Sequence, residues 1–496
     1  MYLSHYLFLI PATLTMVIVG TVYGWTTTSL LHLTSGTGGV PLTLTHDESS
    51  WIVSLTVLGS MFGSLVGAKL ADLIGRKYCL LLCCAIFTLG WLNVYTAPSV
   101  LNLYLARVIL GIGVGIAYTI NPMYVSEIAD INIRGALGTL IAVNVFTGSL
   151  LTCILGHWLT YHSLVVVLVI ISSISFLLNT CFPETPYFLV AKRRKKQACQ
   201  SITYYKGIVD SNEMKIALRA LRPQTRCKLQ PQAKSDLPPE SRSNFPPQSR
   251  SDITKQTWFT KLRVILQRNN RKALFIMLGL IMAQQLGGNF ITMQYLEVLF
   301  SKTTIGIDTN VATILVLAVG LISGTLSTLT VESLGRRKLL ILSTLGSCFT
   351  LIILATYLLL DQHKIDVSIV SAIPVIDLII YQVMFQIGLG TLPNVLLCEL
   401  FPMELKGFVG AIIVIFDGII GFTVSKLYQV ITDSVGSSAI YFIFATSCSL
   451  AFVMVYIWVP ETKGKTYHEI VALLAGENLN SLNEQVRTNE MAIRRI

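Results

Sequence analysis

Two adjacent glutamines and a nearby asparagine interrupt an apolar stretch of the chain. Gln284 and Gln285 carry amides that donate and accept hydrogen bonds at once, as a polar solute requires. Asn289 follows Gln285 by four residues, which would put both on one face of a helix. The same amides could instead hydrogen-bond one helix to another. Because polar side chains inside a membrane segment cost free energy, we expect these three to bind a solute.

Three charged residues also stand within apolar stretches, namely Arg107, Asp417 and Lys426. Asp417 and Lys426 are nine residues apart, which is about 180° around a helix, so they are poor partners for each other. A buried acid such as Asp417 can accept hydrogen bonds or relay protons. Lys426 has a long side chain that can reach toward the end of its helix.

The composition of the chain and its apolar runs predict the helices that hold these residues. The 496-residue chain is 53% hydrophobic and 13% charged, whereas soluble proteins average about 25% charged residues. Apolar stretches of roughly 20 residues, enough to span a bilayer, recur along the chain. The predicted spans cover residues 6–33, 51–72, 78–97, 101–126, 136–158, 163–182, 272–298, 309–331, 338–360, 370–399, 407–430 and 438–459. We therefore expect an all-α membrane protein with twelve transmembrane helices.

A net charge of +11 raises the question of a nucleic-acid partner, so the positions of the basic residues matter. Nearly all of the 37 Lys and Arg residues fall on one side of the predicted membrane. The exceptions are Lys302 and Lys364 in outer loops, and Arg107 and Lys426 within spans. This positive-inside pattern places both termini in the cytoplasm, and it explains the charge without nucleic acid. The run from Lys192 to Lys196 could bind anionic membrane lipid.

A polar segment separates the sixth and seventh spans. Residues 221–252 are rich in Lys, Arg, Gln, Pro and Ser, with too few apolar residues to form a core. The predicted organisation is an N-terminal six-helix bundle (1–186), a basic, partly disordered cytoplasmic linker (187–270), a C-terminal six-helix bundle (271–460) and a cytoplasmic tail (461–496).

The ten cysteines and seven histidines form no metal-binding or catalytic pattern. No Cys-x-x-Cys spacing and no phosphate-binding loop occurs. The first span begins without a basic leader or a cleavage site, so a removable signal peptide is not expected. We predict no enzyme activity, no metal and no cofactor, and we expect the plasma membrane as the location. The oligomeric state stays open.

Three charged motifs recur in the same order in both halves. The first is an acid followed by a glycine and two basic residues. The second is a glutamate seven residues before a basic residue and a glycine, and the third is Pro-Glu-Thr. The matched segments are 72–77 with 332–337, 127–135 with 399–407, and 183–185 with 460–462. A duplicated six-helix unit that holds its substrate between the halves is a recurrent transporter design.

These motifs resemble the major facilitator superfamily and, within it, the sugar transporter family. The resemblance is carried by GAKLADLIGRK (67–77), RVILGIG (107–113), PMYVSEIADINIRG (122–135), PETPYF (183–188), QQLGG (284–288), ESLGRR (332–337), ELFPMELKG (399–407) and PETKGKT (460–466). Tyr187 and the Gly-Asn-Phe sequence at 288–290 resemble those of insect proteins similar to the facilitated trehalose transporters. The resemblance implies the major facilitator fold and transport by alternating access.

The resemblance also implies a gating charge network at the cytoplasmic helix ends, which pairs when the inner gate closes. The expected members are Arg76, Glu127, Arg134, Glu184, Glu332, Arg337, Glu399, Lys406 and Glu461. Exposed pairs worth roughly 0 to 1 kcal/mol each would suit a gate that must open. Alternatively these charges only mark topology, although the positive-inside rule explains the bases and not the repeated glutamates.

The expected substrate contacts include departures from the family. They are Gln284, Gln285, Asn289, Asn394 and Asp417. By resemblance, the family's glutamine of span five falls on Ala142 and its tryptophan of span ten falls on Asn394. Its asparagines of spans seven and eleven fall on Phe290 and Asp417. Half of the usual sugar-binding set is therefore altered, so the solute class stays broad.

Proton-coupled members of the family pair an aspartate in span one, just after a tyrosine, with the arginine of span four. Here Gly24 and Trp25 follow Tyr23, so Arg107 lacks that partner. This favours facilitative uniport of a sugar such as a hexose or trehalose. One alternative is a proton-coupled sugar or organic-solute carrier, in which Asp417 would bind the proton or a cationic solute. The other is a non-transporting nutrient sensor on the same fold.

Overall fold

The computed structural model describes residues 2–36, 42–128, 134–208, 210–220, 265, 268–302, 308–363, 372–401, 403–465 and 467–475. Across these residues the regular structure is helical, without a β-strand. In this part of the chain, twelve segments are long and apolar enough to cross a membrane. The predicted all-α class and the predicted number of spans are confirmed.

Six long helices form the first half. They are α1 (Tyr2–Ser35), α2 (His46–Leu73), α3 (Arg76–Tyr95), α4 (Val100–Ile128), α5 (Arg134–Trp158) and α6 (Tyr161–Thr180). Three shorter helices follow, namely α7 (Pro186–Ala191), α8 (Lys195–Lys206) and α9 (Ser211–Ala220).

The second half repeats the six spans, two of them interrupted. Its helices are α11 (Arg268–Leu286), α12 (Asn289–Gln294), α13 (Leu296–Lys302), α14 (Thr309–Leu334), α15 (Arg336–Gln362), α16 (Ile373–Phe385), the π-helical turn η4 (Gln386–Gly390), α17 (Leu392–Leu400), α18 (Met403–Ser434) and α19 (Ser437–Trp458), followed by α20 (Tyr467–Ala475). Span ten is interrupted, because η4 separates α16 from α17.

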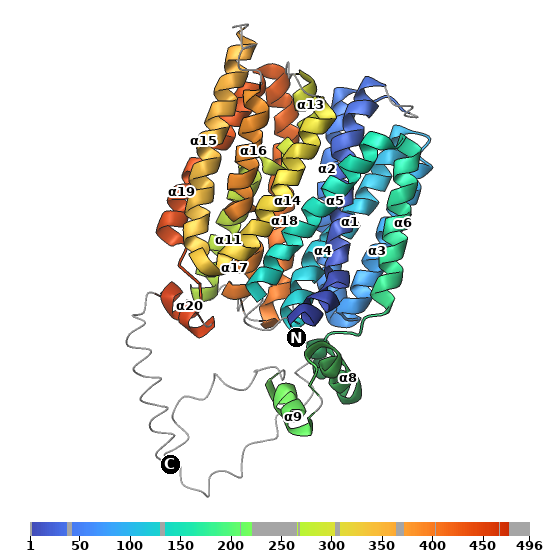
Figure 1. The fold of residues 1–496 in the computed structure, drawn as a ribbon, viewed down its shortest axis with the longest axis vertical. Coiled ribbons are helices and arrows are strands. Elements are labelled where there is room, and N and C mark those ends of the chain that lie inside the picture. Colours follow the sequence, from blue (N-terminus) through green and yellow to red (C-terminus); the bar gives the residue numbers. More distant parts are fainter. Residues whose placement is uncertain are drawn as a thin grey trace, which may run out of the picture.

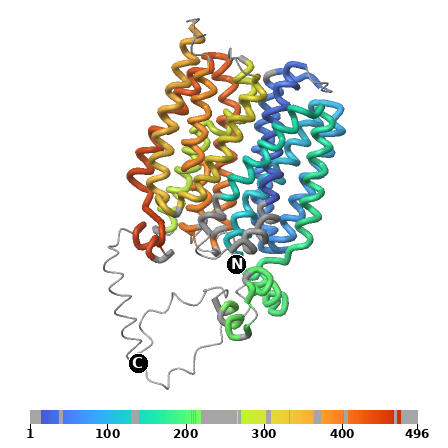
Figure 2. The backbone as a smooth tube through the Cα atoms, viewed as in Figure 1, coloured from blue at the N-terminus to red at the C-terminus, as the bar shows by residue number. Residues whose placement is uncertain are grey.

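The two halves stand side by side with their helices along the long axis (Figure 1). Each half has its own buried apolar core. Across the boundary, α2 packs against α18 and α5 packs against α14. Figure 2 shows α8 and α9, in green, outside the bundle at the end where α20 also lies. Two separate cores joined by these helix pairs leave room for a site between the halves.

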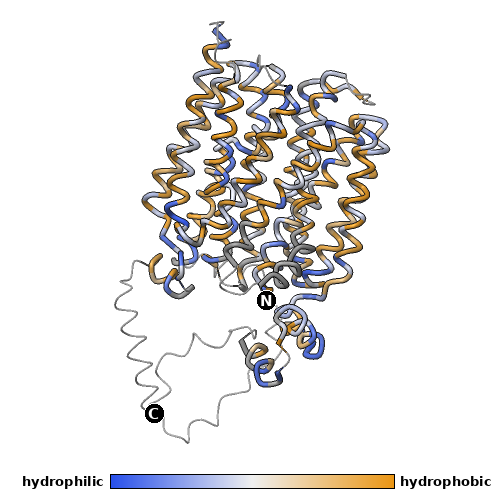
Figure 3. Tube along the Cα trace, viewed as in Figure 1, coloured by the Kyte–Doolittle hydropathy of each residue, from blue (hydrophilic) through white to orange (hydrophobic). Residues whose placement is uncertain are grey.

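The outer faces of the helices are apolar, as Figure 3 shows by the orange colour along the bundle. Large side chains such as Leu329, Phe349 and Leu450 are 65% exposed or more. A soluble protein rarely exposes so many large apolar side chains, whereas a bilayer covers them at no cost.

Span seven was expected to be one continuous helix, and that expectation is wrong. The helix stops at Leu286 and restarts at Asn289. Gly288 between them has φ of +80°, a left-handed conformation that glycine adopts without strain. A Cβ atom at Gly288 would overlap the ring of Phe444. The break therefore removes the regular spacing that would have put Gln285 and Asn289 on one helical face.

Candidate functional site

A cavity of about 210 Å³ lies between the two halves. Helices α1, α2, α4 and α5 line it from the first half, and α11, α12, α14, η4, α17 and α18 line it from the second. The structure brings all of the predicted substrate contacts into its lining, namely Gln284, Gln285, Asn289, Asn394 and Asp417. Their roles in binding stay a prediction.

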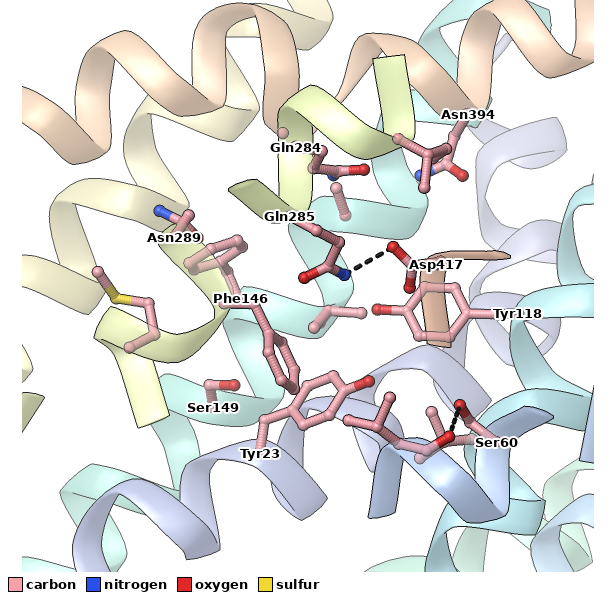
Figure 4. Close-up of a pocket in the computed structure, with 18 of the residues that line it drawn as sticks. Tyr23, Ser60, Tyr118, Phe146, Ser149, Gln284, Gln285, Asn289, Asn394 and Asp417 are labelled. Atoms are coloured by element: carbon pink, nitrogen blue, oxygen red, sulfur yellow. Dashed lines mark hydrogen bonds between the residues drawn. The ribbon is translucent and has the colours of Figure 1, made fainter. Parts of the chain in front are cut away.

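The amide of Gln285 and the carboxylate of Asp417 form the central polar contact of the cavity. Gln285 Nε2 donates to Asp417 Oδ1 at 2.6 Å, as the dashed line in Figure 4 marks. This bond joins α11 to α18 within the second half. It orients one carboxylate oxygen and leaves part of the Asp417 side chain facing the cavity.

Asn289 lines the cavity from α12, after the break, and not from the helix that carries Gln285. Its Nδ2 donates to Gln382 Oε1 on α16 at 2.7 Å, and only 7% of the residue is exposed. Close by, the Thr27 hydroxyl donates to the carbonyl of Met293 at 3.0 Å and so joins α1 to α12 across the two halves. Asn289 therefore connects α12 to α16. Less of its side chain is available to a solute than of the Gln285 side chain.

Further side chains that the sequence did not single out also line the cavity. Among them are the aromatic residues Tyr23, Tyr118 and Phe146 and the amides Gln294 and Gln386. Figure 4 shows the rings of Tyr23, Tyr118 and Phe146 gathered at the cavity. The rule that found Gln285, a polar side chain in an apolar span, would also have found Gln294 and Gln386. The aromatic residues carry no such signal, because rings are ordinary in apolar spans.

Arg107 lies outside the cavity, buried within the first half. Its guanidinium carbon lies 4.1 Å from the ring centroid of Trp25. Its Nη2 donates to Thr26 Oγ1 at 2.7 Å, and its Nη1 donates to the carbonyl of Val22 at 3.3 Å. The ring at position 25 thus stands where an acid was judged missing, and it stabilises the cation through its π face.

Lys426 lies at the other end of α18 from the charge motifs. Its Nζ donates to Ser50 Oγ at 2.8 Å and lies 3.7 Å from the ring centroid of Trp51. Both partners belong to the first turns of α2, so Lys426 links the two halves. The expectation that it reaches toward a helix end is confirmed.

The charge network of the first half ties together the ends of its helices. Arg76 Nη2 lies 2.8 Å from Glu127 Oε1, and the two side chains are 6% and 5% exposed. Thr185 donates its hydroxyl to Glu127 Oε2 at 2.6 Å. Glu184 accepts the backbone N–H groups of Arg76 and Lys77, which begin α3. Burial raises the pKa of the Glu184 carboxyl, and these hydrogen bonds oppose that rise.

The second half repeats this arrangement with the corresponding residues. Arg336 Nη2 lies 2.8 Å from Glu399 Oε1, and Thr462 donates to Glu399 Oε2 at 2.7 Å. Glu461 accepts the backbone N–H groups of Arg336 and Arg337 at the start of α15. The side chain of Arg337 turns away and donates to the carbonyl of Tyr456. The expectation that Arg337 supplies the guanidinium is therefore corrected to Arg336, the counterpart of Arg76.

Two further expectations about these charges change. The Arg76–Glu127 pair is buried, and in the second pair Arg336 is buried while the Glu399 side chain is 18% exposed. The small energies of exposed pairs therefore do not apply, and removing one partner costs more. Each described pair also joins helices of a single half, so neither pair crosses the boundary between the halves. The side chains of the other expected members lie outside the described residues, namely Arg134, Glu332 and Lys406. A gating role stays a prediction.

Residues 12–474 match the family model described as "Sugar (and other) transporter". The chain belongs to the sugar transporter family. Two relatives of this sugar transporter are named facilitated trehalose transporter Tret1. The one from Bombyx mori is 30% identical over 452 residues, which are 91% of this chain and 83% of the relative. The one from Apis mellifera ligustica is 26% identical over 476 residues, which are 96% of this chain and 89% of the relative.

Solved structures of the xylose transporter XylE share the fold of this sugar transporter. The proton:xylose symporter XylE bound to 6-bromo-6-deoxy-D-glucose superimposes with a TM-score of 0.72 at 20% identity, over 95% of this chain and all of that one. The inward open form of XylE from E. coli gives a TM-score of 0.69 at 21% identity, over 95% of this chain and 99% of that one. The likeness identifies the major facilitator fold.

Proposed function

We propose that this sugar transporter carries a sugar such as a hexose or trehalose by facilitative uniport. The observation that carries the proposal is the cavity between the halves, in which amides of Gln284, Gln285 and Asn394 stand beside aromatic rings. Amides match the paired donors and acceptors of sugar hydroxyls, and rings pack against the apolar faces of a sugar.

The proposed mechanism is alternating access by rocking of the two halves about the cavity. Each half has its own core and its own buried charge pair, Arg76 with Glu127 and Arg336 with Glu399, which favours movement of each half as a rigid body. The contacts between α2 and α18 and between α5 and α14 are the surfaces that would shift.

Uniport is supported by the surroundings of Arg107, which has a ring rather than a carboxylate as its close partner. A proton-coupled carrier is the second candidate, and the observation that favours it is Asp417 in the cavity lining. We further propose a plasma-membrane location with both termini in the cytoplasm, on the strength of the positive-inside pattern.

Purified protein in liposomes tests the proposal directly. Uptake of glucose, fructose, trehalose and a polyol is measured with and without an imposed pH gradient. We expect saturable uptake of at least one sugar that ends at equal concentrations and does not follow the gradient. Accumulation driven by the gradient would replace uniport with proton coupling, and binding without flux would indicate a sensor.

A further inference from the structure

Asp417 is the one formally charged side chain among the described residues that line the cavity. No lysine or arginine belongs to that lining, and Asp417 accepts a hydrogen bond from the neutral amide of Gln285. An isolated carboxylate in a low-dielectric site is costly unless a positive charge or a proton compensates it. The cavity therefore has a place for one positive charge.

Aromatic rings surround the same space. Tyr23, Tyr118, Phe146 and Phe290 line the cavity from α1, α4, α5 and α12. The ring centroids of Tyr23 and Phe290 lie 5.4 Å apart with the planes nearly perpendicular, so these two rings pack edge to face. The faces of aromatic rings attract cations, most strongly where water is excluded. A carboxylate flanked by rings is an arrangement suited to an ammonium group.

The uncharged polar groups of the cavity point to the same ligand chemistry. The amide donors of Gln285 and Asn289 are engaged by Asp417 and Gln382. In contrast, Oε1 of Gln294 and Oε1 of Gln386 are buried acceptors with no donor in the part of the chain that the structure describes. Acceptor capacity beside the cavity therefore remains unused, in addition to the amides of Gln284 and Asn394, which can both donate and accept. A protonated primary amine offers three donors and no acceptor.

We propose that the cavity recognises a sugar-like solute that carries a protonated amine, with Asp417 as the counter-ion. This inference rests on the proposed transport function and names a substrate class within it. The ammonium group lies against Asp417 and the rings, and the hydroxyl groups of the solute contact Gln284 and Asn394. Neutral sugars bind the same cavity more weakly, because they leave the carboxylate uncompensated.

The test compares glucosamine, N-acetylglucosamine and glucose as substrates of the full-length protein in liposomes, at a pH where the amine is protonated. N-acetylglucosamine keeps the sugar ring and removes the positive charge. We expect glucosamine to be taken up with a KM at least tenfold lower than that of N-acetylglucosamine. In Asp417→Asn the KM values for glucosamine and N-acetylglucosamine should become equal within about threefold, since the amide keeps the size of the side chain and removes its charge.

Two further variants keep the comparison interpretable. Asp417→Glu retains the charge and should retain a preference for glucosamine. Asp433→Asn removes an exposed acid of the same helix that does not line the cavity, and should behave like the unmodified protein. If Asp417→Asn does not fold, the three-solute comparison in the unmodified protein and in Asp417→Glu still decides the matter.

Equal KM values for the two amino-sugar derivatives, or a preference that survives in Asp417→Asn, would overturn the inference. So would glucose uptake driven by a pH gradient that Asp417→Asn abolishes, because the proton would then be the compensating charge. Uptake of neutral sugars without any amine preference leaves the proposed function intact and removes only this inference. Absence of uptake of every sugar removes both.

Discussion

The guanidinium of Arg107 lies over the indole of Trp25, 4.1 Å from the ring centroid, deep inside the first half. Trp25 also packs edge-on to Trp91, with ring centroids 6.3 Å apart. A cation–π contact in a dry site is worth about 2 kcal/mol. Arg107 and Trp25 are therefore expected to be coupled in stability without any acid.

A double-mutant cycle tests this coupling. Trp25→Leu, Arg107→Met and the double variant are purified, and thermal melting of each is compared. We expect the double variant to be less destabilised than the sum of the single variants, by about 1 to 2 kcal/mol. Strict additivity would mean that the indole merely fills space.

Arg336 and Arg337 are neighbours with different roles, although both stand in the same motif. Arg336→Met removes the cation from a pair in which Arg336 is buried and Glu399 is 18% exposed, a loss of about 3 kcal/mol. Arg337→Met removes one bond to the carbonyl of Tyr456, a loss of about 1 kcal/mol. Melting temperatures should therefore fall far more for Arg336→Met, and Arg76→Met should match it. Equal losses for Arg336 and Arg337 would contradict the pairing seen here.

Gln285→Ala should weaken solute binding while leaving the fold intact. The change removes an amide from the cavity and takes the donor from Asp417 Oδ1. Loss of one buried hydrogen bond costs about 1.4 kcal/mol, which corresponds to about a tenfold rise in KM. The measurement is uptake into liposomes at equal protein content. The control is Gln429→Ala, whose amide bonds Asp433 outside the cavity lining. Unchanged kinetics in Gln285→Ala would remove this residue from the site.

Lys426 is expected to hold together the ends of α2 and α18 that lie away from the charge networks. Lys426→Met loses the bond to Ser50 and the contact with the Trp51 ring, together about 1 kcal/mol or more. Conformers with these ends apart should then become several-fold more populated. Spin-label distances between α2 and α18 report the shift, and Trp51→Phe, which keeps a ring, should show less of it. Identical distance distributions in Lys426→Met and in the unmodified protein would show that Lys426 does not hold the ends of α2 and α18 together.

Glu297 makes stability depend on pH. It lies on α13, just after the seventh span, is 2% exposed, and has no partner for Oε2 within the described residues. Burial, with a smaller contribution from the charge of Asp308, raises the pKa of Glu297 to about 8. The folded chain thus keeps a proton that the unfolded chain releases, so this group's contribution to stability falls as pH rises from the ordinary glutamate pKa to about 8.

Glu297→Gln should abolish that loss, because an amide resembles the protonated acid and cannot ionise. The melting temperature of the variant, relative to the unmodified protein, should rise between about pH 5 and about pH 8 and then level off. Glu213→Gln on the exposed side of α9 is the control, with no such trend. A constant difference across this range would show that Glu297 is not buried as described.

Much of the architecture could be read from the sequence, because its signals are local. Apolar runs of sufficient length predicted the twelve spans, and the repeated motifs predicted two halves. The polar residues Gln284, Gln285, Asn394 and Asp417 stood out against apolar surroundings, and all of them line one cavity. The choice between Arg336 and Arg337 could not be made from the motif, because both are basic and adjacent.

The sequence by itself determined the membrane class, the number of spans and some of the polar side chains that line the cavity, since each depends on hydrophobicity along a single segment. Only the tertiary structure decided what those side chains meet. The turn at Gly288 sends Asn289 toward Gln382, the lysine at 426 reaches Ser50 of the other half, and rings from α1, α4 and α5 line the same cavity as Asp417. Such contacts depend on which helix faces pack together, and that packing is a property of the whole bundle.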